Sequence, residues 1–432
     1  MISIIKYRIA LLLGQLVSFL SQKLKRGTGE QIAGRVITAI SSNAISIAAK
    51  NKEIIVVSAT NGKTSITRLI ASAIKEQYGS VITNALGANQ KAGIISALIS
   101  KENKDAKYCV LEVDERSLPG IFDDLNPKIL LLGNLSRDQL DRFGEVNSIA
   151  TSWKKMLTTS NAHVIANACD ANIVFATLDL QAENISYVDI ETNWHDDANT
   201  CNICGSLLKW DDNNFECTNC DFKKPTNLVY TKLYESIIEK NLSLPGRWNY
   251  NNAKLALCAL DKIGVDSNSI SNAWPDVKDV SGRNAIFDIN NNRALQLFLA
   301  KNPAGYNEML KHISNEISKS KNPESIATIF AFNCNIADGK DPSWLYDVRF
   351  EDFNINNCYV FGERATDIRL RLEIAEKNVE SFNNLDQILN NFSNDIEKYY
   401  LIASYTQFHK LSKTLPKKYE LEIQDKKDEL VK

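Results

Sequence analysis

A short apolar run that leads into a glycine-containing loop limits most strongly how this chain can fold. Residues Glu53–Ser58 (EIIVVS) are almost continuously apolar, which is typical of a strand buried in a parallel sheet. The chain continues as ATNGKTS to Ser65, and apolar residues then recur at helical spacing. A strand, a glycine turn and a helix in this order predict a phosphate-binding loop, in which backbone N–H groups and the helix N-terminus bind the anion.

The side chains of this loop fit the chemistry of a nucleoside triphosphate. We expect Lys63 to neutralise the β- and γ-phosphates, Thr64 to ligate Mg²⁺, and Gly62 to let the backbone approach closely. The complete Walker A pattern would place a glycine at position 57, where this chain has Val57, so the match is partial. An ordinary turn between strand and helix, with an exposed lysine, is the alternative interpretation.

A carboxylate at the end of a second predicted strand can complete a magnesium site. The run Tyr108–Val113 reads as a buried strand, and Glu112 lies near its carboxyl end, where ligands gather in open α/β sheets. Glu112 can hold the cation directly or through water. Asp114 and Glu115 crowd the same corner, so the sequence leaves the ligand open, and a purely structural carboxylate is the alternative.

Alternating strands and helices extend over most of the chain and predict a doubly wound α/β fold. Further apolar runs that read as strands are Ile129–Leu132, His163–Ala166, Ile326–Asn333, Cys358–Gly362 and Tyr399–Ser404. Helical spacing marks Asn251–Ile263 and Ala365–Ala375. A boundary near Val280–Ala285 separates a predicted central ATP-binding domain, residues 51–283, from a smaller α/β C-terminal domain, residues 284–432.

Four of the nine cysteines form a metal-binding pattern. The pairs Cys201-x2-Cys204 and Cys217-x2-Cys220 are separated by twelve residues, within a polar stretch from about residue 195 to 226 that interrupts the α/β pattern. Two such pairs place four thiolates around Zn²⁺, and the zinc would be structural because no ligand position stays open. It would stabilise an insertion that lacks a core of its own.

The beginning of the chain predicts a helix at the surface. Lys6 and Arg8 precede an interrupted apolar run from Ile9 to Leu20, which is too short to span a bilayer. We expect residues 1–50 to form a helical segment that packs on the body or touches a membrane surface. Scattered cysteines favour a reducing, cytoplasmic compartment. The net charge of −2 gives no reason to expect nucleic-acid binding.

Several segments in order resemble the Mur ligase family. Residues 59–64 (ATNGKT) are similar to its ATP-binding loop, although the family usually has glycine in place of Ala59. Residues 111–113 (LEV) are similar to its magnesium-binding strand. The resemblance implies that ATP is bound by Thr60, Asn61, Gly62, Lys63, Thr64 and Ser65, and Mg²⁺ by Thr64 and Glu112.

Two later segments extend this resemblance toward the C-terminal domain. Residues 244–253 (LPGRWNYNNA) resemble a family segment whose asparagines lie near the adenine, and Asn249 and Asn252 take those places. The SGRN segment resembles the one that leads into the last domain, so Arg283 is implied as a nucleotide contact. Asn284 departs from the residue that usually follows in that segment.

Finer motifs narrow the resemblance to the MurT family. They are the four-cysteine insertion, GAN at 87–89, EVDE at 112–115, SRDQLDRFGE at 136–145, KNPAG at 301–305, ADGKDPSWLYDVRFE at 337–351 and GERATD at 362–367. The match extends from the N-terminal helix to about Tyr405. Each motif is weak alone, but their order together with the cysteine insertion is specific.

This resemblance implies a carbon–nitrogen ligase of peptidoglycan biosynthesis that works with a GatD-like glutaminase partner. Such subunits use ATP to activate the α-carboxylate of D-glutamate in lipid II as an acyl phosphate, and ammonia from the partner gives D-isoglutamine. Lys63 and Glu112 would act in catalysis. An aspartate of the C-terminal domain would complete the partner's Cys-His pair. We select Asp347, with Asp338 and Asp341 as alternatives.

Two other interpretations stay open. A Mur-type amino-acid-adding ligase or a relative of folylpolyglutamate synthetase would share the ATP site, but the four-cysteine insertion is not expected in either. A zinc-ribbon scaffold with a decayed nucleotide site is the third possibility, and its support is limited to Ala59 and Asn284.

Overall fold

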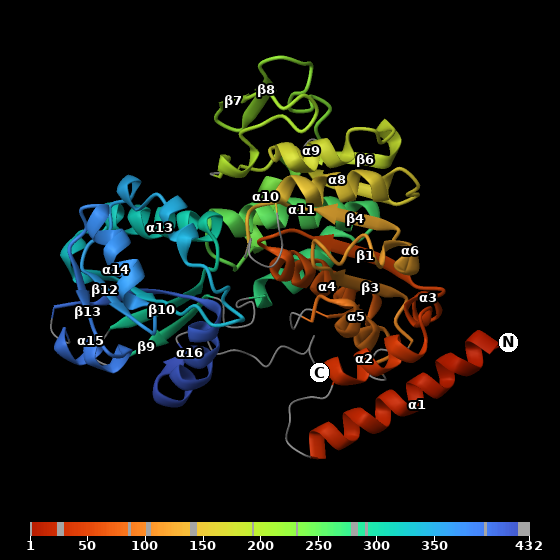
Figure 1. Ribbon diagram of the computed structural model, residues 1–432, viewed down its shortest axis with the longest axis horizontal. Helices are drawn as coiled ribbons and strands as arrows, with labels where there is room; N and C mark the ends of the chain where they lie inside the picture. Colours follow the sequence, from red (N-terminus) through yellow and green to blue (C-terminus); the bar gives the residue numbers. More distant parts are fainter. Residues whose placement is uncertain are drawn as a thin grey trace. The chain divides into compact units, whose positions relative to one another are not determined.

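The chain folds into two compact units, each built on a mainly parallel sheet (Figure 1). The computed structural model describes residues 2–23, 30–84, 88–100, 105–138, 145–191, 194–229, 232–277, 284–289, 293–392 and 395–421. The described residues of 2–135 and 146–277 form the first unit, and those of 136–145 and 284–421 form the second. The predicted α/β fold class is confirmed.

Six parallel strands organise the first unit, in the order β2-β3-β1-β4-β5-β6. The strands are β1 (Glu53–Ser58), β2 (Ile82–Thr83), β3 (Tyr108–Glu112), β4 (Ile129–Leu132), β5 (His163–Asn167) and β6 (Ile185–Val188). β1 lies between β3 and β4, with Ile55 opposite Val110 and Ile129. The strand order reverses beside β1, so its carboxyl end is the place where ligands bind in such sheets.

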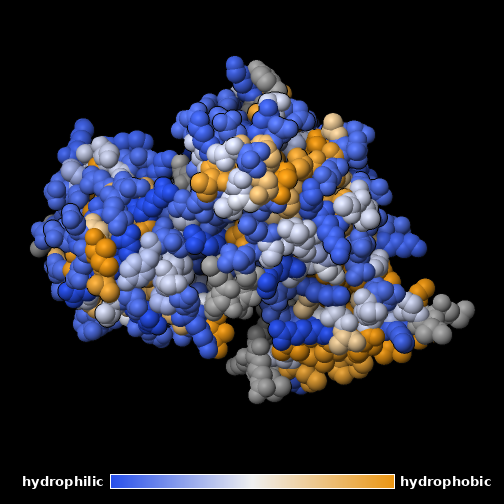
Figure 2. Space-filling view, turned by 45° about the horizontal axis from the view of Figure 1, so that its top comes forward, coloured by the Kyte–Doolittle hydropathy of each residue, from blue (hydrophilic) through white to orange (hydrophobic). Residues whose placement is uncertain are grey.

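Three N-terminal helices form a layer outside this sheet: α1 (Ile2–Lys23), α2 (Glu30–Ile40) and α3 (Ala44–Ala49). α1 runs along α2 so closely that a Cβ at Gly14 would lie 2.6 Å from Ile37 Cγ1. α1 leaves a band of apolar surface facing solvent (Figure 2).

The length of α1 corrects one expectation. Residues 3–21 are long and apolar enough, by length and composition alone, to cross a membrane, and only 11% of that stretch is buried. The run from Ile9 to Leu20 is therefore only part of a longer helix, and shortness does not exclude a span.

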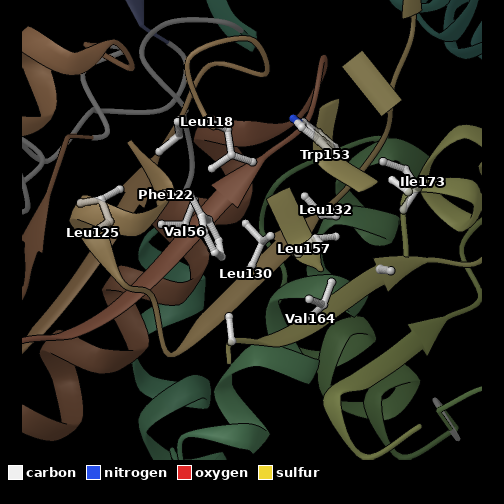
Figure 3. Close-up of a cluster of buried hydrophobic side chains, with 14 of the residues drawn as sticks. Val56, Leu118, Phe122, Leu125, Leu130, Leu132, Trp153, Leu157, Val164 and Ile173 are labelled. Atoms are coloured by element: carbon white, nitrogen blue, oxygen red, sulfur yellow. The ribbon is translucent and has the colours of Figure 1, made fainter. Parts of the chain in front are cut away.

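Helices cover both faces of the first sheet. On one face α5 (Lys91–Leu98), α6 (Phe122–Leu125), α8 (Val146–Leu157) and α9 (Ala171–Thr177) enclose a core. Val56, Leu130 and Val164 of the strands meet Phe122 and Trp153 there (Figure 3). The helices that pack together on the other face are α4 (Lys63–Tyr78), α10 (Lys232–Asn241), α11 (Arg247–Lys262) and α12 (Ser267–Ala273).

The cysteine-rich insertion is a small module beside α9 (Figure 1). Its hairpin pairs β7 (Leu208–Asp211) with β8 (Asn214–Cys217) in antiparallel fashion. Asn202 Nδ2 donates to Asn172 Oδ1 at 2.8 Å, which fastens the module to α9. The 3₁₀ turns of this unit are η1 (Ala182–Asn184), η2 (Asp196–Ala198) and η3 (Trp274–Asp276).

The second unit has a seven-stranded sheet in the order β13-β12-β11-β14-β10-β9-β15. Its strands are β9 (Asn284–Asp288), β10 (Ala294–Leu299), β11 (Ile326–Ala331), β12 (Cys358–Phe361), β13 (Val379–Ser381), β14 (Lys398–Ala403) and β15 (Glu420–Leu421). The five strands β10 to β14 pair with one another in parallel, whereas β9 pairs antiparallel with both β10 and β15. The strand–helix alternation did not predict this antiparallel edge.

Among the described residues of the second unit there are four helices and three 3₁₀ turns besides the strands. The helices are α13 (Pro303–Lys319), α14 (Ala365–Ile374), α15 (Leu385–Asn391) and α16 (Tyr405–Lys418), and the turns are η4 (Pro323–Ser325), η5 (Ser343–Asp347) and η6 (Phe350–Asp352). α15 and α16 bury Ile388 and Phe408 against one face of the sheet. Asn302 caps the N-terminus of α13, since its Oδ1 accepts from Gly305 N at 2.8 Å.

Candidate nucleotide and metal sites

The loop after β1 has the backbone of a phosphate site. Gly62 has φ +89°, a left-handed conformation that glycine adopts without strain. A Cβ there would also lie 2.5 Å from Asn252 Oδ1, so the position lacks room for a side chain. α4 begins directly after Gly62, with neither a side-chain cap nor an acidic residue in its first turn. The positive end of the helix is therefore available to an anion.

Asn134, which the sequence analysis did not single out, holds this loop to the end of β4. Its side-chain Oδ1 accepts from Asn61 N and its Nδ2 donates to Asn61 O, each at 2.9 Å. Thr60 N donates to the backbone carbonyl of Asn134, also at 2.9 Å. The one signal for this residue was its place just after a neighbouring buried strand.

The alanine at position 59 fits its surroundings. Ala59 is fully buried and has no positive φ, so its backbone does not require glycine. A Cβ added to Gly133 would lie 2.9 Å from the Ala59 methyl group. The space that a larger residue at 133 would need is thus filled by Ala59, and the departure from glycine leaves the loop intact.

Two oxygen ligands for a cation lie side by side where α4 begins. Thr64 Oγ1 donates to Glu112 Oε2 at 2.8 Å, and both residues are buried. Asn84 fixes the backbone of Glu112, because Glu112 N donates to Asn84 Oδ1 at 2.9 Å and Asn84 Nδ2 donates to Glu112 O at 2.8 Å. A hydroxyl and a carboxylate are oxygen ligands of the kind that Mg²⁺ prefers, so the residues present fit this ion.

The carboxylates of Glu112, Asp114 and Glu115, at the carboxyl end of β3, have different partners. Asp114 Oδ1 accepts from the backbone N–H groups of the two residues that follow Glu115, at 3.2 and 3.1 Å, which makes it a turn cap. Glu115 Oε2 lies 2.9 Å from Lys63 Nζ, and both side chains are only 11% exposed. Glu112, beside Thr64, is then our candidate ligand for a cation, and Glu115 is the counter-ion of Lys63.

The two predicted nucleotide-binding asparagines of α11 are placed differently. Asn252 lies directly over the loop at Gly62. Asn249 Nδ2 donates to Pro245 O at 2.7 Å, while its buried Oδ1 has no hydrogen-bond partner among the residues that the structure describes. A buried acceptor without a donor is a natural contact for a ligand N–H group.

Two further predicted nucleotide contacts are less informative. Ser65 lies in the first turn of α4 and is half-buried. Arg283 lies outside the described residues, and so does the GAN glycine at position 87.

The four cysteines of the insertion come together as one cluster. All four Sγ atoms lie within 4.8 Å of one another, with Cys201–Cys220 at 3.7 Å and Cys204–Cys217 at 3.4 Å. These separations exclude disulfides, whose sulfurs are about 2.05 Å apart. Four sulfurs on a tetrahedron with bonds of about 2.3 Å to zinc lie roughly 3.8 Å apart, so the cluster fits Zn²⁺.

The local backbone closes the first knuckle and favours the thiolate form of one of the four cysteines. Gly205 turns the chain at φ +76°, and its N–H donates to Cys201 O at 2.9 Å, which closes the first knuckle. The pKa of the Cys204 thiol is lowered to about 6, first because the backbone N–H of Ser206 donates to it. Thiolates bind zinc, so this shift favours the metal-bound form. Phe215 is buried beneath the hairpin.

The three candidate aspartates of the second unit differ in how far their carboxylates are already used. Asp338 is buried and accepts from Thr406 N at 2.7 Å and Thr406 Oγ1 at 2.6 Å, which ties the loop after β11 to the first turn of α16. Asp341 accepts from the backbone N–H at the start of η5 at 2.9 Å. The Asp347 side chain is 40% exposed, and its carboxylate lies 3.1 Å from Arg137 Nη1.

Comparison with known proteins assigns both units to one family. Residues 57–260 match the Mur ligase middle domain, and residues 299–408 match the MurT ligase C-terminal domain. The MurT subunit of lipid II isoglutaminyl synthase (glutamine-hydrolyzing) from Streptococcus pneumoniae strain R6 is 32% identical, over 93% of this chain and 95% of its own. The Staphylococcus aureus strain COL protein of the same name is 30% identical over 82% and 84%.

A likeness among solved structures supports the same fold. A pseudomurein peptide ligase type C from Methanothermus fervidus superposes with a TM-score of 0.62 at 16% identity, over 89% of this chain and 83% of that one. The Mur-ligase-type fold predicted from the sequence is confirmed. Because the sequence identity extends along nearly the whole chain and both domain families match, this chain belongs to the MurT family and is a ligase subunit.

Proposed function

We propose that this chain amidates the α-carboxylate of D-glutamate in the stem peptide of lipid II, at the expense of ATP, to give D-isoglutamine. The observation that carries the proposal is its membership of the MurT family, whose named relatives are subunits of lipid II isoglutaminyl synthase. The loop after β1 supports the same activity, because it has the backbone and the charges of a triphosphate site.

Binding of the phosphates requires an exchange of ion-pair partners at Lys63. The ammonium group lies 2.9 Å from Glu115 Oε2. The γ-phosphate would replace that carboxylate, while the N-terminus of α4 and the loop amides hold the remaining phosphate oxygens. Thr64 and Glu112 would hold Mg²⁺, which supplies positive charge to the transferring phosphoryl group.

This exchange predicts a gain in nucleotide affinity for Glu115→Gln. The glutamine no longer competes with phosphate for Lys63, so we expect the Kd for ATP to fall roughly fivefold, the value of an ion pair worth about 1 kcal/mol. Isothermal titration calorimetry measures it. Glu53→Gln, which removes the exposed partner of Lys128 from the other end of β1, is the matched control. Weaker ATP binding with a raised Mg²⁺ requirement would instead make Glu115 a metal ligand.

The nucleoside end of ATP would lie along α11. The open Oδ1 of Asn249 can accept from the adenine amino group, and Asn252 would contact the loop side of the nucleotide. Arg283, proposed from the family resemblance, would add a further contact.

The chemistry needs two displacements and no side-chain nucleophile. An oxygen of the substrate carboxylate attacks the γ-phosphorus, and ADP leaves with the bond electrons. The resulting acyl phosphate reacts with ammonia at its carbonyl carbon, and inorganic phosphate departs. Lys63 and the loop amides stabilise the negative charge that develops on the phosphoryl oxygens.

A GatD-like glutaminase partner would supply the ammonia by hydrolysing glutamine. Asp347 is our candidate for orienting the partner's imidazole, in the way that the third member of a catalytic triad does. The structure supports this choice over Asp338, which is buried in hydrogen bonds, and over Asp341, which caps η5. Asp347 has an exposed carboxylate whose ion pair with Arg137 can be exchanged.

Asp347→Asn is expected to separate the two nitrogen sources. With the partner present, glutamine-dependent amidation should fall at least about a hundredfold, since an amide cannot hold the imidazole in the required form. Ammonium-dependent amidation should stay unchanged, because the ligase centre is intact. Asp341→Asn serves as the matched control. Equal loss with both nitrogen donors would mean that Asp347 acts in structure and not in the partner's site.

Lipid II is a membrane-embedded substrate, so the enzyme would work on the cytoplasmic face of the cell membrane. The decisive test incubates the full chain with ATP, Mg²⁺, ammonium and detergent-solubilised lipid II, and detects the amide by mass spectrometry. An ATP-dependent amide supports the proposal. If none forms even with the glutaminase partner and glutamine present, the assignment of this reaction is wrong.

A further inference from the structure

α1 presents an apolar face that no described residue of its own unit covers. The exposed large apolar residues of this helix are Ile4, Ile5, Ile9, Leu12, Leu13, Leu16, Phe19 and Leu20. Leu12 is the most exposed of them, at 68%, and Phe19 follows at 59%. These side chains form the band of apolar surface in Figure 2. Contiguous apolar surface of this extent on a folded protein marks a contact with a partner or a membrane.

The opposite face of α1 is packed against the protein. Ala10, Gly14 and Ser21 are buried, and Gly14 lets the helix approach Ile37 of α2. α2 in turn lies on α5, where a Cβ at Gly34 would be 2.0 Å from Ala92 O. α1 is therefore fixed lengthwise to the surface of its unit. Its 22 residues extend about 33 Å, at roughly 1.5 Å per residue.

Basic side chains border the apolar face on both sides. With 3.6 residues per turn, the exposed apolar positions occupy one side of α1, Arg8 lies with Gln15 at one border and Lys6 lies at the other. Ile2–Lys23 contains no acidic residue, although the whole chain has a net charge of −2. Lys23 at the helix end lies 5.9 Å from the centre of the Phe19 ring.

A helix that buries apolar side chains while cations flank them on both sides matches the interface of an anionic bilayer. The apolar face enters the acyl region, and the flanking cations remain at the level of the phosphates. A second copy of this helix would bring like charges together along both borders.

We infer that α1 docks the ligase on an anionic lipid surface, lying in the plane of the interface. The helix stays packed on α2, so docking adds a membrane contact without unfolding the unit. This contact would hold the active site near a lipid-linked substrate, and that role rests on the proposed function. Binding of α1 to lipid is independent of the proposed function, because it is measured without substrate or ATP.

The test is flotation of the full chain with preformed vesicles, either of phosphatidylcholine alone or with phosphatidylglycerol added. Wild type should bind the anionic vesicles on the order of tenfold more strongly, and added salt should reduce the difference. Leu12→Gln with Leu16→Gln keeps the helix propensity and removes apolar contact, so it should lower the partition coefficient at least about tenfold. Leu233→Gln in α10, at the same 68% exposure as Leu12, should bind like wild type.

Lys6→Gln with Arg8→Gln provides a second, independent variant. It should lose the preference for anionic vesicles and keep the weaker apolar binding. Circular dichroism of each variant checks that α1 and the fold persist. Amidation of detergent-solubilised lipid II should be the same in wild type and in the Leu12/Leu16 variant, so failure of the ligase reaction and failure of docking are separate results.

Three results would overturn the inference. In one, wild type does not float with anionic vesicles. In another, Leu233→Gln reduces binding as much as the Leu12/Leu16 change does. In the third, light scattering finds a dimer that the Leu12/Leu16 change converts to a monomer, without vesicle binding in either form. A second copy of the chain would then be what covers α1.

Discussion

Lys63→Ala is expected to lower ammonium-dependent amidation by on the order of a thousandfold, with lipid II and Mg²⁺ held at saturation. The ammonium group is the side-chain cation that the structure places at the N-terminus of α4, next to Thr64 and Glu112. Its removal would leave only Mg²⁺ and the loop amides to balance the negative charge that develops on the γ-phosphoryl oxygens. Formation of the amide over time, followed by mass spectrometry, measures the loss.

The Lys63→Ala variant needs a control, because it leaves the Glu115 carboxylate without its ion-pair partner Lys63. Glu115 is only 11% exposed, and without Lys63 it would be a poorly solvated charge. Lys63→Met combined with Glu115→Gln removes both charges, so it should restore thermal stability and leave amidation as low as in Lys63→Ala. Lys128→Ala, at the opposite end of β1, should be fully active. Activity within tenfold of wild type in Lys63→Ala would contradict the proposed phosphate site.

Cys217→Ser is expected to abolish stoichiometric zinc binding and to unfold the insertion selectively. The module has a two-stranded sheet and few buried residues of its own, so the metal must supply much of its stability. Purified wild type should carry one zinc per chain by elemental analysis. Hydrogen exchange should show fast exchange of residues 200–223 in the variant, while the amides of β1, β3 and β4 remain protected.

Cys334→Ser is the matched control, since Cys334 is also partly buried but belongs to the second unit and is not a member of the cluster. Its zinc content and its exchange pattern should equal those of wild type. Removing zinc from wild type with a chelator should reproduce the exchange pattern of Cys217→Ser. A module that stays protected without metal would show that packing around Phe215, and not zinc, holds it together.

Buried strands were the features most readable from the sequence. β1 occupies the six residues of the EIIVVS run, and β4 the four residues of Ile129–Leu132. Strands covered on both faces are apolar at every position, so their limits are visible without knowledge of their neighbours. β2 and β15 were not foreseen, because each has only two residues and a strand so short has no pattern.

Contacts between distant segments could not be predicted in the same way. Asn134 binds a backbone 73 residues away and Asn84 one 28 residues away, and a single asparagine carries no periodic signal. Glu112, Asp114 and Glu115 have different partners because the chain turns at the end of β3 and each carboxylate points in a different direction. The motifs predicted which residue types form the site, whereas these contacts became known only from the structure.

The close approach of Ala59 and Gly133 has an evolutionary consequence. The two positions lie on adjacent strand ends and share one methyl-sized space, which only one of them can fill. A chain with alanine at position 59 requires glycine at position 133. A chain in which position 133 changes to a larger residue must first have glycine at position 59. The pair should therefore covary among relatives, and the alanine here marks one of the permitted combinations.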